Sequence, residues 1–189
     1  NVIRPQTEEF HDYRGYGGRI VGGIFKPGDK VTVLPSGFSS KIKSIDTFDG
    51  SIDEAFTPMS VTMTLEDDVD VSRGDMIVAD NNQPESTQDV DVMVCWMNNK
   101  AIVPNGKYAL KHTTNDVRCV VKEIQYKIDV NTLHKIEDDK VVGMNDIARL
   151  KLRTTAPIFI DKYNRNRMTG SLILIDENTN ETVAAGMIR

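Results

Sequence analysis

Three histidines, His11, His112 and His134, are the side chains of this sequence best suited to proton transfer near neutral pH. None of them stands near a serine or cysteine in the setting of a nucleophile elbow, the sharp turn that exposes a catalytic serine. A catalytic triad can also assemble from residues far apart in sequence, so that alternative stays open. Because His112 ends a strand pattern, its simplest interpretation is a hydrogen-bonding residue at the rim of a sheet. We assign no catalytic residue.

The glycine-rich segment 14–23 is the part of the chain that could suggest phosphate binding. A phosphate-binding loop needs the string Gly-x-x-x-x-Gly-Lys-Ser/Thr, whose backbone N–H groups surround the phosphates. This string does not occur anywhere in the 189 residues. A tight hairpin with bulges explains the glycines better.

Metal binding has equally little support. The acidic runs 66–70 and 137–139 lack the alternate carboxylates, central glycine and closing glutamate of a calcium-binding EF-hand loop. Cys95 and Cys119 form neither a Cys-x-x-Cys pair nor a His/Cys cluster. Both lie in apolar runs, so we expect them to be unpaired and to serve as small hydrophobic residues. We predict that these residues bind no metal and no cofactor.

Basic side chains concentrate late in the chain. Arg149, Lys151 and Arg153 occupy alternate positions, which places them on one face of a strand, and further basic residues follow in the segment 162–167. Such a stripe could be a solvated face, a contact for an acidic protein surface, or a site for RNA phosphates. No aromatic stacking platform accompanies it, and the net charge of −5 makes nucleic acid the least expected partner.

The composition is typical of a folded, water-soluble protein. Hydrophobic residues make up 39% and charged residues 27% of the sequence. The longest strongly apolar run, 92–97, is far shorter than the roughly 20 residues of a membrane-spanning helix, and no signal-peptide pattern is present. The cysteine pattern favours a reducing compartment. We expect a cytoplasmic protein without a membrane contact.

Short strands separated by proline and glycine turns dominate the pattern. Pro27-Gly28 suits the two central positions of a type II turn, and residues 60–65 alternate strictly between polar and apolar side chains. Only residues 131–137 offer a short helical turn. The predicted strands cover residues 31–34, 41–45, 60–65, 76–79, 90–97, 107–112, 118–128, 147–152, 171–175 and 182–188.

A polar segment divides these strands into two groups. Residues 80–89 contain no large apolar side chain, which makes them the best candidate for a linker. Closely and regularly spaced strands on both sides favour antiparallel barrels. The predicted fold class is therefore all-β, with two consecutive antiparallel β-barrels over residues 1–82 and 83–189.

The order of these motifs resembles the second and third domains of the large subunit of bacterial sulfate adenylyltransferase (ATP sulfurylase), a translation-factor-like GTPase. In the first half the resemblance rests on the strings Arg14-Gly15-Tyr16-Gly17-Gly18, Gly28-Asp29-Lys30-Val31-Thr32-Val33-Leu34-Pro35-Ser36-Gly37, Phe48-Asp49-Gly50 and Ser72-Arg73-Gly74-Asp75, and on residues 61–65. In the second half it rests on Trp96-Met97, Tyr108-Ala109-Leu110-Lys111-His112, Asp129-Val130-Asn131-Thr132-Leu133, Asn166-Arg167-Met168-Thr169-Gly170-Ser171, Ile175-Asp176 and residues 182–188. Each motif is weak alone, but their number and order are specific.

The resemblance implies barrels of the translation-factor domain 2 and domain 3 types that follow a GTPase domain in a longer protein. That enzyme makes adenosine 5'-phosphosulfate and diphosphate from ATP and sulfate, in sulfate assimilation. In the family the small subunit performs the adenylyl transfer, and GTP hydrolysis in the large subunit, with Mg²⁺, drives the reaction. A nodulation protein that carries a fused kinase is similar. Neither the phosphate loop nor the guanine-reading Asn-Lys-x-Asp occurs in these residues, so we expect them to be inactive alone.

The implied role is docking and coupling, because GTP hydrolysis performs work only through contacts that differ between nucleotide states. The expected partners are the chain's own N-terminal GTPase domain and the small catalytic subunit. The candidate contact residues lie in three turns: Arg14 and Gly15; Arg73, Gly74 and Asp75; and Asn166 and Arg167. The alternative is a translation-factor-like module that binds RNA or protein.

Overall fold

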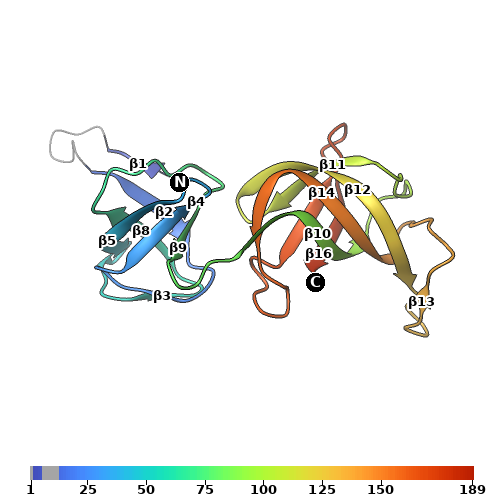
Figure 1. Ribbon diagram of the computed structural model, residues 1–189, viewed down its shortest axis with the longest axis horizontal. Coiled ribbons are helices and arrows are strands. Elements are labelled where there is room, and N and C mark those ends of the chain that lie inside the picture. Colours follow the sequence, from blue (N-terminus) through green and yellow to red (C-terminus); the bar gives the residue numbers. More distant parts are fainter. Residues whose placement is uncertain (1, 6–12) are drawn as a thin grey trace. The chain divides into compact units, whose positions relative to one another are not determined.

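The computed structural model describes residues 2–5 and 13–189, and within these residues all regular structure is β-sheet (Figure 1). The chain divides into two compact units, Asn1–Gln83 (unit 1) and Pro84–Arg189 (unit 2). The predicted all-β fold class is confirmed. No helix of the described residues is long and apolar enough to cross a membrane.

Unit 1 is built on one antiparallel sheet. Its hydrogen-bonded order is β1 (Val2–Ile3), β2 (Gly15–Arg19), β8 (Ser60–Leu65), β5 (Phe38–Thr47), β4 (Lys30–Leu34) and β9 (Met76–Ala79). β6 (Gly50–Ser51) pairs with β5, and β3 (Ile24–Phe25) forms a separate ribbon with β7 (Ala55–Phe56). Alternation along β4 turns Val31 and Val33 inward, and both are buried. Ile42 and Ile45 of β5 are also buried, although they are three residues apart, and the ladder between β5 and β8 shifts its register between Ile42 and Ser44.

The turn at Pro27-Gly28 has the backbone that its sequence predicts. Gly28 has a φ of +90°, which a side chain would oppose, and Asp29 N–H donates to the Lys26 carbonyl (3.1 Å). The Asp29 carboxylate also accepts from the Lys26 backbone N–H (2.7 Å). The turn therefore leads the chain into β4 with its backbone groups satisfied.

Unit 2 is a closed barrel of six antiparallel strands. The order is β11 (Lys107–His112), β15 (Ser171–Ile175), β16 (Thr182–Ile188), β10 (Glu85–Trp96), β14 (Ile147–Ile160) and β12 (Asn115–Ile128), and β12 pairs with β11 to close the ring. β13 (Lys135–Ile136) extends the β12 edge. The interior holds an apolar cluster that includes Val92, Leu110, Leu150 and Leu174, all fully buried. Closure leaves none of the six strands as a free edge.

Residues 85–89 are part of β10, so the prediction that the whole segment 80–89 is a linker was wrong. Glu85, Ser86 and Thr87 pair with residues 158–160 at the end of β14. Their side chains are polar because they face solvent or a bulge, while their backbone groups complete the ladder. Because residues 85–89 are polar, the sequence pattern did not reveal that they belong to a strand.

The short helical turn predicted for residues 131–137 was also wrong. The Asp129 carboxylate accepts the backbone N–H groups of Asn131 and Thr132, which makes a side-chain-closed turn instead of a helix. Leu133 has a φ of +60°, and Lys135–Ile136 then pairs with the end of β12. The capping side chain is the aspartate two residues before the asparagine that the pattern indicated.

Candidate functional site

Arg14 lies beside an aromatic ring and an acid at the start of β2. Its guanidinium carbon is 5.8 Å from the centre of the Tyr16 ring, and one of its terminal amino groups contacts the Asp70 carboxylate. Tyr16 is buried, and its hydroxyl donates to the Val69 carbonyl (2.5 Å). Burial is the main cause that raises the Tyr16 pKa, so the hydroxyl keeps its proton as a donor. These contacts hold the start of β2 against the segment that follows β8.

Arg14 Nε is buried and has no hydrogen-bond partner within the described part of the chain. A buried donor without a partner costs stability, typically about 1–3 kcal/mol. This cost is tolerated here beside two favourable contacts of the same guanidinium, with Tyr16 and with Asp70.

The packing around β2 in the sheet of unit 1 requires glycine at position 15. A Cβ at this position would lie 2.6 Å from the Thr62 methyl group and 2.9 Å from the Tyr13 ring. Gly15 pairs with Thr64 on one side and with Ile3 on the other. Its place in the sequence is therefore explained by the fold without a contact outside the chain.

The segment Ser72-Arg73-Gly74-Asp75 forms a turn that enters β9. Gly74 has a φ of +102°, which the third position of a type II turn requires, and Asp75 N–H donates to the Ser72 carbonyl (3.1 Å). The Asp75 carboxylate accepts from the Ser72 backbone N–H (2.7 Å). Asp75 and Gly74 thus build the turn, and Arg73 is the residue whose exposed side chain points out of it.

Asn166 and Arg167 lie in the connection between β14 and β15 of unit 2. The Asn166 side-chain oxygen accepts from the backbone N–H groups of Met168 (2.9 Å) and Thr169 (3.4 Å). The asparagine therefore shapes the loop, and the neighbouring Arg167 is exposed. In these two turns a polar side chain, Asp75 or Asn166, holds the backbone, and a nearby arginine, Arg73 or Arg167, is exposed.

The two described histidines, His112 and His134, lie in different surroundings. His112 is buried, not at an accessible rim, and its Nε2 lies 2.7 Å from the Thr169 carbonyl. Burial lowers the pKa of His112, so the neutral ring donates this hydrogen bond. His134 is exposed, and His11 lies outside the described residues.

The first two predicted turns both belong to unit 1. Arg14 contacts Asp70, which is three residues from Arg73 in the segment that joins β8 to β9. Asn166 and Arg167 belong to unit 2, and we describe them separately. The predicted residues are therefore divided between the two units, and Gly15, which is buried in the sheet of unit 1, is not at the surface.

The basic stripe on β14 is neutralised by its neighbouring strands. Each of its three side chains meets an acid on β10 or β12: Arg149 with Asp91 (2.5 Å), Lys151 with Glu123 (2.9 Å) and Arg153 with Asp89 (2.6 Å). The Arg149 guanidinium lowers the pKa of Asp91. Of the three interpretations left open by the sequence, the solvated face fits these cross-strand pairs.

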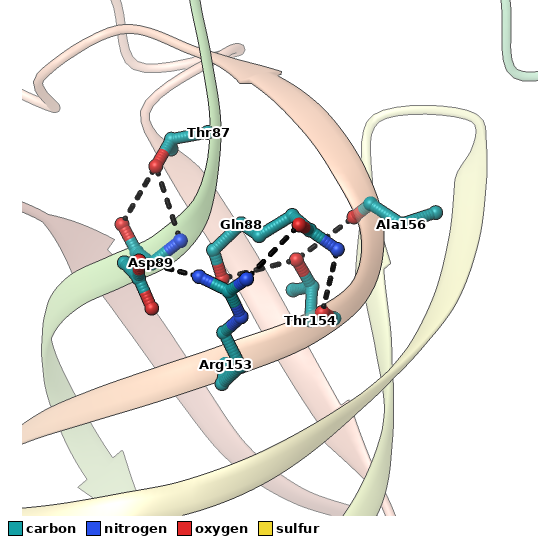
Figure 2. Close-up of polar contacts among 6 residues, drawn as sticks. All are labelled: Thr87, Gln88, Asp89, Arg153, Thr154 and Ala156. Atoms are coloured by element: carbon teal, nitrogen blue, oxygen red, sulfur yellow. Dashed lines mark hydrogen bonds and ion pairs between the residues drawn. The ribbon is translucent and has the colours of Figure 1, made fainter.

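The beginning of β10 carries a polar network that sequence reasoning missed. Figure 2 shows Arg153 between Asp89 and Gln88, whose side-chain oxygen accepts from the guanidinium (3.1 Å). The Gln88 amide donates to the Thr154 carbonyl (3.2 Å), and the buried Thr154 hydroxyl donates to the Ala156 carbonyl (2.8 Å). This network fills the register shift of the ladder between residues 87 and 89. The only sequence signal was a polar string that resembled a linker.

The described residues hold no group of three or more His, Cys, Asp or Glu side chains that could bind a metal ion. Members of both acidic runs contact donors of the chain: Asp67 with Ser40, Asp70 with Arg14, and Asp139 with Lys127. Cys119 is buried, and burial raises its pKa to about 12. Both cysteines are unpaired, as predicted, but Cys95 is exposed, so only Cys119 is a buried hydrophobic residue.

Comparison with known sequences finds relatives over almost the whole chain. A family model described as GTP-eEF1A C-terminal domain-like matches residues 89–189. The bifunctional enzyme CysN/CysC of Mycobacterium tuberculosis is 47% identical over 99% of this chain and 31% of its own length, and that of Rhodopirellula baltica is 50% identical over 99% and 28%. Sulfate adenylyltransferase subunit 1 of Bacteroides thetaiotaomicron is 43% identical over 99% of this chain and 39% of its own length. The resemblance inferred from the sequence is confirmed, and the chain spans about a third of the length of these relatives.

Solved structures show the same fold in translation factors. Sup35 complexed with GDP matches with a TM-score of 0.83 at 20% identity, over 93% of this chain and 43% of the Sup35 chain. Elongation factor SelB of Methanococcus maripaludis in its apo form matches with a TM-score of 0.72 at 19% identity, over 93% of this chain and 39% of that chain. At these identities the likeness concerns the fold alone.

Proposed function

We propose, from the premise that this chain belongs to the GTP-eEF1A C-terminal domain-like family, that it is the non-catalytic C-terminal region of the GTPase subunit of sulfate adenylyltransferase. The observation that carries this proposal is the 43–50% identity, over 99% of the chain, to proteins named sulfate adenylyltransferase subunit 1 and CysN/CysC. The whole enzyme forms adenosine 5'-phosphosulfate from ATP and sulfate in the cytoplasm. GTP and Mg²⁺ bind in its GTPase domain.

In this proposal the two units transmit the nucleotide state of the GTPase domain by contacts with that domain and with the small catalytic subunit. A closed barrel with a packed core suits this role, because such a body moves as a unit instead of deforming. Useful coupling then requires that its surface contacts differ between the GTP and GDP states. Arg73 and Arg167 are the contact candidates, because each projects from a turn that other residues hold in shape.

The test is charge reversal in the complete polypeptide, assayed together with the small subunit. We expect Arg73→Glu or Arg167→Glu to weaken assembly or to reduce GTP-dependent synthesis of adenosine 5'-phosphosulfate by tenfold or more, as the loss of an interface charge of about 1.4 kcal/mol would. Lys43→Glu in unit 1 and Lys122→Glu in unit 2 are matched controls, since both lysines are exposed strand residues. Unchanged assembly and unchanged coupling in both arginine variants would remove these two residues from the proposed interface.

The structure weakens the case for the alternative function, binding of RNA, because that case depended on the basic stripe of β14. The three basic side chains of β14 are each paired with an acid, so the stripe carries little free positive charge. Salt-dependent retention of this chain on immobilised RNA, with an affinity that falls steeply as salt rises, is the result that would restore this alternative.

A further inference from the structure

Strands β14, β10, β16 and β15 are neighbours in the sheet of unit 2 (Figure 1). The outer face of these strands carries an apolar groove. Its volume is about 570 Å³. We name it the methionine groove and define it by six lining residues: Met93, Cys95, Met168, Ile173, Ala185 and Met187. None of the residues proposed above for docking lines it, although Arg167 adjoins one of its members.

Strand register explains why the groove is continuous. One row of outward positions crosses four strands and consists of Ile147, Cys95, Ala185 and Ile173, each opposite the next. The adjacent row sets Met93 opposite Met187. Side chains directly opposite one another on neighbouring strands touch, so these residues form one apolar surface and not scattered single positions.

On one side of the groove, the outer positions of β10 and β14 are charged. The outward positions that precede Met93 on β10 are Asp89 and Asp91, and both form ion pairs with arginines of β14. Met187 and Met168 are 45% and 42% exposed. A contiguous patch of exposed apolar residues with a polar border is typical of a protein–protein contact, and methionine side chains adapt well to a partner's shape.

Cations border the groove. Lys111 lines it and lies opposite Ile173 on β11, at the end of the apolar row. Lys162 and Arg167 are exposed residues of the loop between β14 and β15, and each directly precedes a lining residue in the sequence. Lys111 also lies 3.6 Å from Asp116, a loose pair in which both side chains are well exposed. A second copy of this chain would bring these cations against one another, so the complementary surface is apolar with carboxylates at its border.

We propose that the methionine groove is the docking surface for a separate protein chain, the small subunit of sulfate adenylyltransferase, through an apolar segment flanked by acidic side chains. This inference rests on the proposed function, because a protein named subunit 1 works with at least one other subunit. Apolar anchors seated in a groove and surrounded by charge pairs are the arrangement that concentrates binding energy in protein interfaces.

The test measures binding of the purified small subunit to the complete polypeptide that contains these residues. Met187→Asp should weaken binding at least tenfold, because it places a charge in the middle of the apolar surface. Met144→Asp is the matched control: Met144 is 53% exposed and lies outside the groove, and its variant should bind within twofold of the unchanged protein. Lys111→Glu combined with Arg167→Glu should weaken binding and reduce its dependence on salt.

A second readout needs no substitution. Cys95 is exposed and lies in the groove, so the bound small subunit should slow its alkylation at least tenfold. This measurement separates occupancy of the groove from damage to the fold, because the unchanged protein is used in both arms.

The outcomes are distinct. If the small subunit does not bind the unchanged polypeptide, the proposed function itself fails. If it binds Met187→Asp and Met144→Asp equally and leaves Cys95 reactive, the groove inference is overturned while the proposed function stands. If Cys95 becomes protected with rising concentration of the polypeptide alone, as it forms dimers, a second copy occupies the groove and the inference is again wrong.

Discussion

The Nε2 atom of His112 lies 2.7 Å from the carbonyl oxygen of Thr169, and this bond ties the end of β11 to the loop that precedes β15. Burial lowers the pKa of His112 from its ordinary value of 6.5, and the Thr169 bond and the Asp161 charge oppose the shift only in part. As the pH falls through 6.5, His112 therefore gains its proton in the unfolded chain before it does so in the folded chain. The folded state then loses stability as the pH falls from 6.5 towards the lowered pKa.

We expect the free energy of unfolding of unit 2 to be lower at about pH 5.5 than at about pH 7.5. The variant His112→Gln keeps an amide donor near Thr169 but cannot titrate, so it should show a flatter pH dependence. Denaturant unfolding followed by fluorescence of Trp96, the single tryptophan, measures both proteins. If the free energy of unfolding depended on pH identically in the two proteins, His112 would not be the group that causes the pH dependence.

The two cysteines should differ sharply in reactivity. Burial raises the pKa of Cys119 to about 12 and shields the thiol, whereas Cys95 is exposed. We expect iodoacetamide to modify Cys95 alone in the folded protein and both cysteines in denaturant, as counted by mass spectrometry. The variant Cys95→Ser should remain unmodified until it unfolds, and modification of folded Cys119 would show that the barrel opens.

Gly170 should not tolerate a side chain. A Cβ there would lie 2.4 Å from Tyr163 Cα and 2.5 Å from the Asn166 carbonyl oxygen, and neither backbone atom can move independently. We expect Gly170→Ala to destabilise unit 2 by about 2 kcal/mol or more. In the control, Gly143→Ala, the nearest atom to the new Cβ is Asp146 Oδ2 at 3.9 Å, so its effect should stay within about 0.5 kcal/mol. Equal effects in denaturant unfolding would show that the loop rearranges.

The pair of Asp91 and Arg149 should contribute a measurable coupling. Arg149 donates from Nε to Oδ1 (2.8 Å) and from a terminal nitrogen to Oδ2 (2.5 Å), and both side chains are about two-thirds covered. A double-mutant cycle that replaces Asp91 and Arg149 by alanine should give a coupling free energy of about 1 kcal/mol. The same cycle for the exposed pair of Lys111 and Asp116 should give a coupling free energy of about zero.

That coupling should also depend on pH. Arg149 lowers the pKa of Asp91 from 3.8, so the stabilisation is complete above pH 3.8 and is lost as the pH falls further through the lowered value. Repeating the cycle in acid checks the sign, and a coupling that persists unchanged after Asp91 is protonated would argue against an ionic contact.

The sequence by itself determined the fold class and most strands, because alternation and turn residues are local signals. The strands at 60–65, 107–112, 171–175 and 182–188 have the bounds that the pattern predicts. The order of weak motifs also identified the family, since many short matches in a defined order are specific even when each one is not. The turns around Gly28 and Gly74 followed from the same local chemistry.

The tertiary structure alone decided which side chains face each other. The pattern placed Arg149, Lys151 and Arg153 on one face, but only the ladder partners showed that acids neutralise them. The methionine groove likewise depends on Met93 and Met187 lying opposite each other, although they are distant in sequence. Register between distant strands is a non-local property, set by barrel closure and core packing, so no window of sequence could contain it.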